Sequence, residues 1–198
     1  EDLGGGNYLV TLKVYRECGP ANTQGTDFDD IIFLGVFGSS TNQLQQVDDV
    51  FLNFGTVLDV PIVMTNPCGT PPPDLCVEEA TYTTTLTLGS SPAGYDIAWQ
   101  RCCRNPSISN LANAGGTDNP GMTATIHIPG TFETTTSNSS PVFQTFPPVA
   151  LCANFEFFFD NAAIDPDGDE LVYSLCAPFD GGGPNGGGGG FGSPVPNP

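Results

Sequence analysis

Basic residues are nearly absent from this chain. It has four Lys and Arg against 22 Asp and Glu, a single His, and a formal net charge of −18 over 198 residues. So acidic a chain repels phosphate backbones and anionic membrane surfaces, which excludes nucleic-acid binding through counterion release and disfavours lipid headgroups. All four basic residues lie within the first 104 positions, and the remaining part carries nine acidic residues and no Lys or Arg. That part is expected to be solvated and to favour cations.

Long apolar runs and helical periodicity are also missing. No run of about 18 apolar residues occurs, so no membrane span is expected. The chain starts at Glu1 with no signal-like segment, which is typical of a mature product or a fragment. The single His127 has no nearby nucleophile in the sequence, and no phosphate-binding glycine motif precedes a helix. We therefore expect a protein that is not an enzyme.

Alternating apolar and polar residues are abundant instead. This period-two pattern predicts strands over 7–16, 80–88, 95–101 and 123–128. A short apolar run predicts another over 31–37, and two more are expected over 50–64, separated by a break at 53–55. Many short strands joined by turns rich in Gly and Pro indicate an all-β fold, with an Ig-like β-sandwich over residues 1–137. His127 falls on the polar face of its strand, where a solvent-facing imidazole is expected.

A composition change near residue 138 predicts a domain boundary. A Thr- and Ser-rich stretch ends there and a Pro-rich one begins, and Asn138 opens an Asn-Ser-Ser motif that is a candidate glycosylation site. Residues 138–180 offer only two predicted strands, 149–160 and 170–176, too few for a stable sandwich. We expect an incomplete second Ig- or cadherin-like module there, followed by a Gly- and Pro-rich extended segment over 181–198.

The seven cysteines point to disulfides outside the cell. Zinc sites need CxxC or Cys/His pairs, and this chain has no CxxC and only one His. Spacing favours a local bridge across a turn-rich loop, a second bridge between the two predicted strands of the last module, and a long-range third. The favoured pairs are Cys68–Cys76, Cys152–Cys176, and Cys18 with Cys102 or Cys103. One thiol is left over, and a strained bridge between the two adjacent cysteines is the remaining alternative.

An acidic turn lies between the last two predicted strands. Carboxylates alternate around Gly168, which brings hard oxygen ligands of the kind that Ca²⁺ requires to one point. The loop is not an EF-hand, because the positions that need Gly and Glu hold Glu170 and Cys176. The candidate calcium ligands are Asp165, Asp167 and Asp169, with Glu170 as a weaker fourth. The alternative is a plain Asp-Gly turn closed by Asx hydrogen bonds.

Two strings carry a family resemblance. Residues 99–105 (WQRCCRN) and 165–176 (DPDGDELVYSLC) resemble large secreted surface proteins of the Bacteroidota, and 4–18 looks like the opening strand of the same module. Such proteins carry PKD-like or cadherin-like repeats and a gliding-motility-type sorting domain. The resemblance implies Ig-like sandwiches, export by the type IX route, a role in adhesion or surface structure, and calcium in the DxDGD loop. The sorting domain is missing here, so a segment of a longer protein is expected.

Together these features predict a structural protein of the cell surface. The segment 181–198 has too few apolar groups to offset the entropy of its own ordering, which favours contact with another copy. Our leading hypothesis is a building block of an extracellular filament, assembled head-to-tail through extended segments. The alternative is a monomeric adhesin module that binds glycans or proteins. Tyr95 and Trp99 are its candidate sugar-stacking residues, although their strand positions favour core packing.

Overall fold

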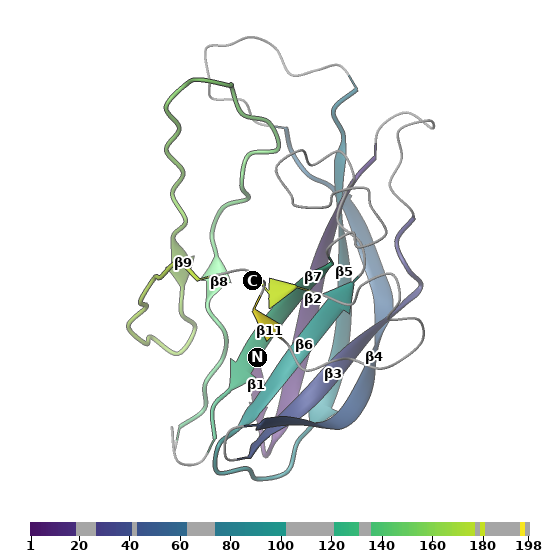
Figure 1. Ribbon diagram of the computed structural model, residues 1–198, viewed down its shortest axis with the longest axis vertical. Helices are drawn as coiled ribbons and strands as arrows, with labels where there is room; N and C mark the ends of the chain where they lie inside the picture. Colours follow the sequence, from purple (N-terminus) through teal and green to yellow (C-terminus); the bar gives the residue numbers. More distant parts are fainter. Residues whose placement is uncertain are drawn as a thin grey trace.

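A computed structural model describes residues 1–18, 27–40, 43–62, 74–101, 121–130, 136–176, 179–180 and 195–196. All regular structure within these ranges is β, which confirms the all-β prediction (Figure 1). No helix that could cross a membrane occurs in this part of the chain.

Seven strands form one antiparallel sheet. In chain order they are β1 (Asp2–Gly4), β2 (Asn7–Glu17), β3 (Ile31–Ser40), β4 (Gln43–Asp59), β5 (Val77–Thr87), β6 (Tyr95–Arg101) and β7 (Met122–Ile128). Their order in the sheet is β1-β2-β5-β4-β3-β6-β7. Five of the predicted strands correspond to β2, β3, β5, β6 and β7, whose alternating residues place one apolar face inward.

The prediction of two strands over 50–64 is wrong. β4 runs unbroken to Asp59, and it pairs with β3 up to Asn53 and with β5 from Asn53 onward. The predicted break coincides with a bulge between Phe54 and Val57. A Cβ on Gly55 would lie 2.6 Å from the Thr81 carbonyl oxygen, so only glycine lets the two backbones approach there. The glycine therefore bends the strand without ending it.

The sheet curls until its distant strands share one core. One buried cluster contains Val10 of β2 together with Ile97 and Trp99 of β6. In the sheet, β2 and β6 are separated by β5, β4 and β3. Figure 1 shows this curl on the right of the molecule. Tyr82 of β5 is fully buried in the cluster, and its hydroxyl donates to the Asp29 carbonyl oxygen over 2.7 Å. That bond satisfies a polar group whose burial would otherwise be costly.

The chain after β7 contains little regular structure. β8 (Val142–Phe143) pairs with β9 (Ala163–Ile164), beside the curled sheet in Figure 1. β10 (Phe179–Asp180) pairs with β11 (Val195–Pro196) and lies against β7. The strands predicted over 149–160 and 170–176 are wrong, because these described residues form no ladder with any other described strand. The proposed boundaries at 137 and 180 stay predictions.

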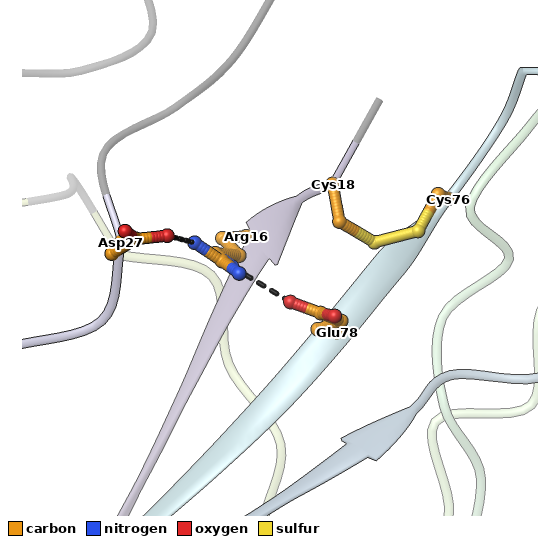
Figure 2. Close-up of a disulfide and its surroundings, with 5 residues drawn as sticks. All are labelled: Arg16, Cys18, Asp27, Cys76 and Glu78. Atoms are coloured by element: carbon orange, nitrogen blue, oxygen red, sulfur yellow. Dashed lines mark hydrogen bonds and ion pairs between the residues drawn. A yellow bond between two sulfur atoms is a disulfide. The ribbon is translucent and has the colours of Figure 1, made fainter. Parts of the chain in front are cut away.

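One disulfide closes the end of the β2–β5 pair (Figure 2). Cys18 follows β2 and Cys76 precedes β5, with their Cα atoms 5.0 Å apart. Both expected partners, Cys68 for Cys76 and Cys102 or Cys103 for Cys18, are therefore wrong. The pairing follows from strand register, since Glu17 lies opposite Val77 and the next residues on each strand must also face one another. Cys68, Cys102 and Cys103 lie outside the described residues.

The expected Cys152–Cys176 bridge is also wrong. Cys176 is a free, exposed thiol, whereas Cys152 is part of a disulfide. This bridge was expected between two strands, and neither strand forms. The described cysteines thus leave one thiol accessible on the surface.

Arg16 adds a charged tie next to the disulfide. Figure 2 shows its guanidinium between two carboxylates, with Nε 2.7 Å from Glu78 Oε2 and Nη1 2.7 Å from Asp27 Oδ1. These partners raise the pKa of Arg16. The guanidinium also lies 4.7 Å from the centroid of the Phe28 ring. Arg16 thereby holds the chain that leads into β3 against the end of β2.

We expect removal of this disulfide to destabilise the fold strongly. The bridge closes a loop with a sequence separation of 58, for which the chain-entropy relation gives about 4 kcal/mol. Cys18→Ser with Cys76→Ser should lower the melting temperature by about 10 °C, measured by circular dichroism. Cys176→Ser is the matched control and should leave it unchanged. Equal melting of both variants would contradict the assigned bridge.

Candidate functional site

One aromatic contact fastens the C-terminal part (residues 136–176) to the sheet. Phe146 packs on the outer face of β2, with its ring centroid 6.1 Å from that of Tyr15 in an edge-on arrangement. The ammonium of Lys13 lies 5.8 Å from the same centroid. Cation–π and edge-to-face contacts of this kind each contribute about 1 kcal/mol. The C-terminal part is therefore held at a defined point of the sheet.

A buried carboxylate supports this contact from below. Glu79 of β5 is only 3% exposed, accepts a hydrogen bond of 2.7 Å from the Tyr15 hydroxyl, and lies 3.1 Å from Lys13 Nζ. Burial by itself would raise the pKa of Glu79, but the Tyr15 hydrogen bond and the Lys13 charge outweigh it and lower the pKa. Burial and the same hydrogen bond raise the pKa of Tyr15. The charged form of Glu79 thus positions both side chains that hold Phe146.

The acidic turn is closed by its own backbone. Asp165 Oδ1 accepts hydrogen bonds from the amides of Asp167 (2.9 Å) and Asp169 (3.1 Å). Gly168 adopts φ +85°, a conformation that favours glycine. This is the Asx turn that the sequence offered as the alternative to a calcium loop.

The other carboxylates of the turn bind the start of the C-terminal part. Asp167 Oδ2 accepts from the Ser139 amide over 2.5 Å, and Asp169 Oδ2 accepts from Asn138 Nδ2 over 3.0 Å. The Ser139 hydroxyl in turn accepts from the Asp2 amide over 3.2 Å, which links the turn to β1. The turn therefore acts as a clamp between residues 138–139 and the edge of the sheet. The Nδ2 atom that a glycan on Asn138 would need is engaged in this clamp.

The predicted calcium ligands do not converge here. Asp165 is directed to the turn's own amides and Asp167 and Asp169 to the neighbouring segment, while Glu170 is exposed. Within the described residues, no group of three His, Cys, Asp or Glu side chains is placed to hold a metal. Calcium binding by these four residues stays a prediction, as does glycosylation of Asn138.

Apolar side chains dominate the open surface of the C-terminal part. Phe158 and Val172 are 83% and 88% exposed, and Leu175 is fully exposed. Further exposed apolar side chains of the same part are Val142, Phe143, Leu151, Phe155, Ile164 and Tyr173. These exposed side chains are distributed over residues 142–175, and exposed apolar groups in such number are candidates for contact with another molecule. This surface is the principal candidate functional site.

A pocket of about 330 Å³ lies at one end of the sheet. The turn before β2, the end of β5, and the ends of β6 and β7 meet there, and its lining has no charged side chain. Tyr95 lines it and donates from its hydroxyl to the Gly89 carbonyl oxygen over 3.1 Å. Tyr8 also lines it, its hydroxyl has no hydrogen bond to any described residue, and burial followed by Asp2 and Tyr95 raises its pKa. A small neutral ligand suits such a lining.

The remaining predicted residues divide between core and surface. Trp99 is 9% exposed and packs in the core, so it is unsuited to sugar stacking. His127 is on the outer face as expected, and its Nδ1 lies 3.0 Å from Asp96 Oδ1. Sequence reasoning missed Tyr8, Glu79 and Phe146. The one available signal was the outward-facing Lys13 and Tyr15 on a strand whose other face is apolar.

Comparisons with protein-family models, with curated proteins and with solved structures find no match for this chain.

We expect stability to fall in acid because of Glu79. Its pKa is lowered on folding, so its contribution is complete above the unfolded value of about 4.3 and disappears as the pH falls through the folded value. Glu79→Gln should lower the melting temperature at pH 7 and reduce its change between neutral pH and about pH 3. Glu17→Gln, an exposed change on the adjacent strand, should do neither. If the melting temperatures of Glu79→Gln and the parent chain change by the same amount over this pH range, the role assigned to Glu79 is contradicted.

The clamp and the calcium site predict different responses to mutation. Asp167→Ala removes the acceptor of the Ser139 amide and should speed amide exchange over 136–142 without any added ion, because a lost hydrogen bond to a charged group costs about 2 kcal/mol. Glu170→Ala, which removes an exposed carboxylate, should change nothing. If calcium holds the turn, exchange should instead depend on added Ca²⁺ and respond to both variants.

Proposed function

We propose that this chain is a non-enzymatic extracellular structural protein, a building block of a cell-surface filament assembled head-to-tail through extended segments. The observation that carries the proposal is the uncovered apolar surface of the C-terminal part, where Phe158, Val172 and Leu175 are almost entirely exposed. A second copy that covers this surface would bury those groups, at about 25 cal/mol per Å² of apolar area.

The strand order supports an Ig-like module. Ig constant domains have strands A-B-E-D in one sheet and C-F-G in the other. Here β1-β2-β5-β4 and β3-β6-β7 follow the same sequence, joined along the β4–β3 pair into one continuous sheet. The bridge differs, since Cys18–Cys76 joins neighbouring strands. Disulfides are typical of secreted proteins, and this supports a location outside the cell.

The titratable groups of the described residues favour a structural role over catalysis. His127 and Asp96 pair on an open strand face, and neither lines the pocket. Asp165, Asp167 and Asp169 are engaged with amide groups that hold the chain in place. The resemblance to surface proteins of the Bacteroidota agrees with such a role and stays a prediction.

A second candidate function is a monomeric adhesin module that binds a glycan. The pocket lined by Tyr8 and Tyr95 favours it, because its aromatic rings, exposed backbone and lack of charge suit a neutral sugar better than an ion.

The filament proposal predicts assembly that grows with protein concentration. Sedimentation velocity and negative-stain imaging of the full chain should show species larger than one chain, and elongated particles at the highest concentrations. A single compact particle at every concentration would contradict the proposal. If such a monomer binds an oligosaccharide on a glycan array, and Tyr8→Phe weakens that binding while Tyr173→Phe does not, the adhesin function is the correct one.

A further inference from the structure

One strand of the sheet has an unpaired edge. The Leu9 amide of β2 donates to the Glu1 carbonyl oxygen over 2.8 Å, and the Glu1 amino group donates to the Leu9 carbonyl oxygen over 2.9 Å, both on the side away from β5. Backbone groups alternate sides along a strand, so those of Thr11, Lys13, Tyr15 and Glu17 face the same side. The Cys18 amide, which donates to Cys76 on the β5 side, agrees with this alternation. No other backbone of the described residues bonds to this edge beyond Leu9.

An apolar hollow lies beside this edge. It is lined by Val10 and Leu12 of β2, Ile97 and Trp99 of β6, and Ala124 and Ile126 of β7, and its volume is about 70 Å³. Among the described strands no ladder joins β2 to β7, so none of them closes the curled sheet along this seam. Ile126 is 41% exposed there. An open edge next to an apolar hollow is the arrangement that accepts an additional strand.

The chain also carries an extended segment without a sheet. Leu171–Cys176 has no ladder partner, and Val172, Tyr173 and Leu175 are more than half exposed. Its main tie is the Tyr173 hydroxyl, which accepts from the Ala163 amide over 2.9 Å. Six residues span about 20 Å as a strand, close to the roughly 23 Å of the seven residues Thr11–Glu17. The segment reads Leu-Val-Tyr-Ser-Leu-Cys, rich in strand-forming residues.

We propose that Leu171–Cys176 of one copy adds as a strand to the Thr11–Glu17 edge of β2 in a second copy. This inference rests on the proposed filament and names its donor and its acceptor. The occupant is a second copy because, within one chain, Asp167 ahead of the donor is tied to Ser139 and Leu175 is fully exposed, so the donor does not pack on its own sheet. Donor and acceptor are different surfaces, so the contact repeats head-to-tail and does not close on two copies.

The donor strand would pair with the unpaired edge of β2 and cover the apolar hollow beside it. Its backbone pairs with the four edge residues of β2, and every second side chain enters the seam between β2 and β7.

Matched variants of the full chain test the two surfaces separately. Thr11→Pro removes an edge amide that has no partner within its own sheet, and Thr11→Val keeps it. Val172→Asp with Leu175→Asp places charges on the donor, and Asn161→Asp places a charge on an exposed polar position outside both the donor and the apolar surface. Thr11→Pro and the donor variant should each raise the concentration needed for half-assembly by roughly tenfold or more, and the two controls should not. Circular dichroism and melting confirm that each variant folds.

Hydrogen exchange supplies a readout that needs no variant. The amides of Thr11, Lys13, Tyr15 and Glu17 should exchange fast in dilute protein and become protected as assembly proceeds. If the wild type assembles but these amides stay fast, or if Thr11→Pro or the donor variant assembles normally, the inference is overturned and the filament proposal survives. Protection of the four amides in a dilute monomer would show that the chain fills its own seam, which also overturns it. A wild type that never assembles overturns both.

Discussion

The open seam of the curled sheet is the constraint on which the rest of this structure depends. Seven strands form one continuous sheet. To bury the core, this sheet must curl until β2 lies across the core from β6 and β7, strands to which it is not hydrogen-bonded. This curl buries Val10 and Trp99, but it leaves β2 and β7 without hydrogen bonds to each other. A closed barrel would have no free edge. In the part of the chain that the structure describes, the β2 edge beyond Leu9 has no partner strand, and it lies beside side chains of the core.

The C-terminal part is attached to the sheet through few contacts. It is attached by Phe146 on the Lys13 and Tyr15 side chains and by the acidic turn on Asn138 and Ser139. Neither attachment covers the apolar residues farther along the chain. The carboxylates that resemble a calcium loop are used for fastening, and the buried charge of Glu79 holds the platform for Phe146. The acidic residues thus have local structural roles in a chain whose net charge opposes association.

Local pattern predicted β2, β3, β5, β6 and β7, each of which has a buried face, but it also predicted strands over 149–160 and 170–176 that do not form. It failed where the outcome depended on distant partners. The sequence predicts a break of β4 at Asn53–Gly55, because a bulge with a change of pairing partner has the same local composition as a turn. Cys18–Cys76 depends on the register of two strands far apart in the sequence, and Phe146 on a contact between separate parts. The Asx turn was within reach of the sequence, since Asp-Pro-Asp-Gly-Asp encodes it locally.

The most direct test is a cryo-electron-microscopy map of the assembled material. The account predicts an additional strand alongside Thr11–Glu17 of β2, with density continuous with a neighbouring copy and side chains that fit Leu171–Cys176. A map in which copies meet elsewhere and the β2 edge faces solvent would contradict it.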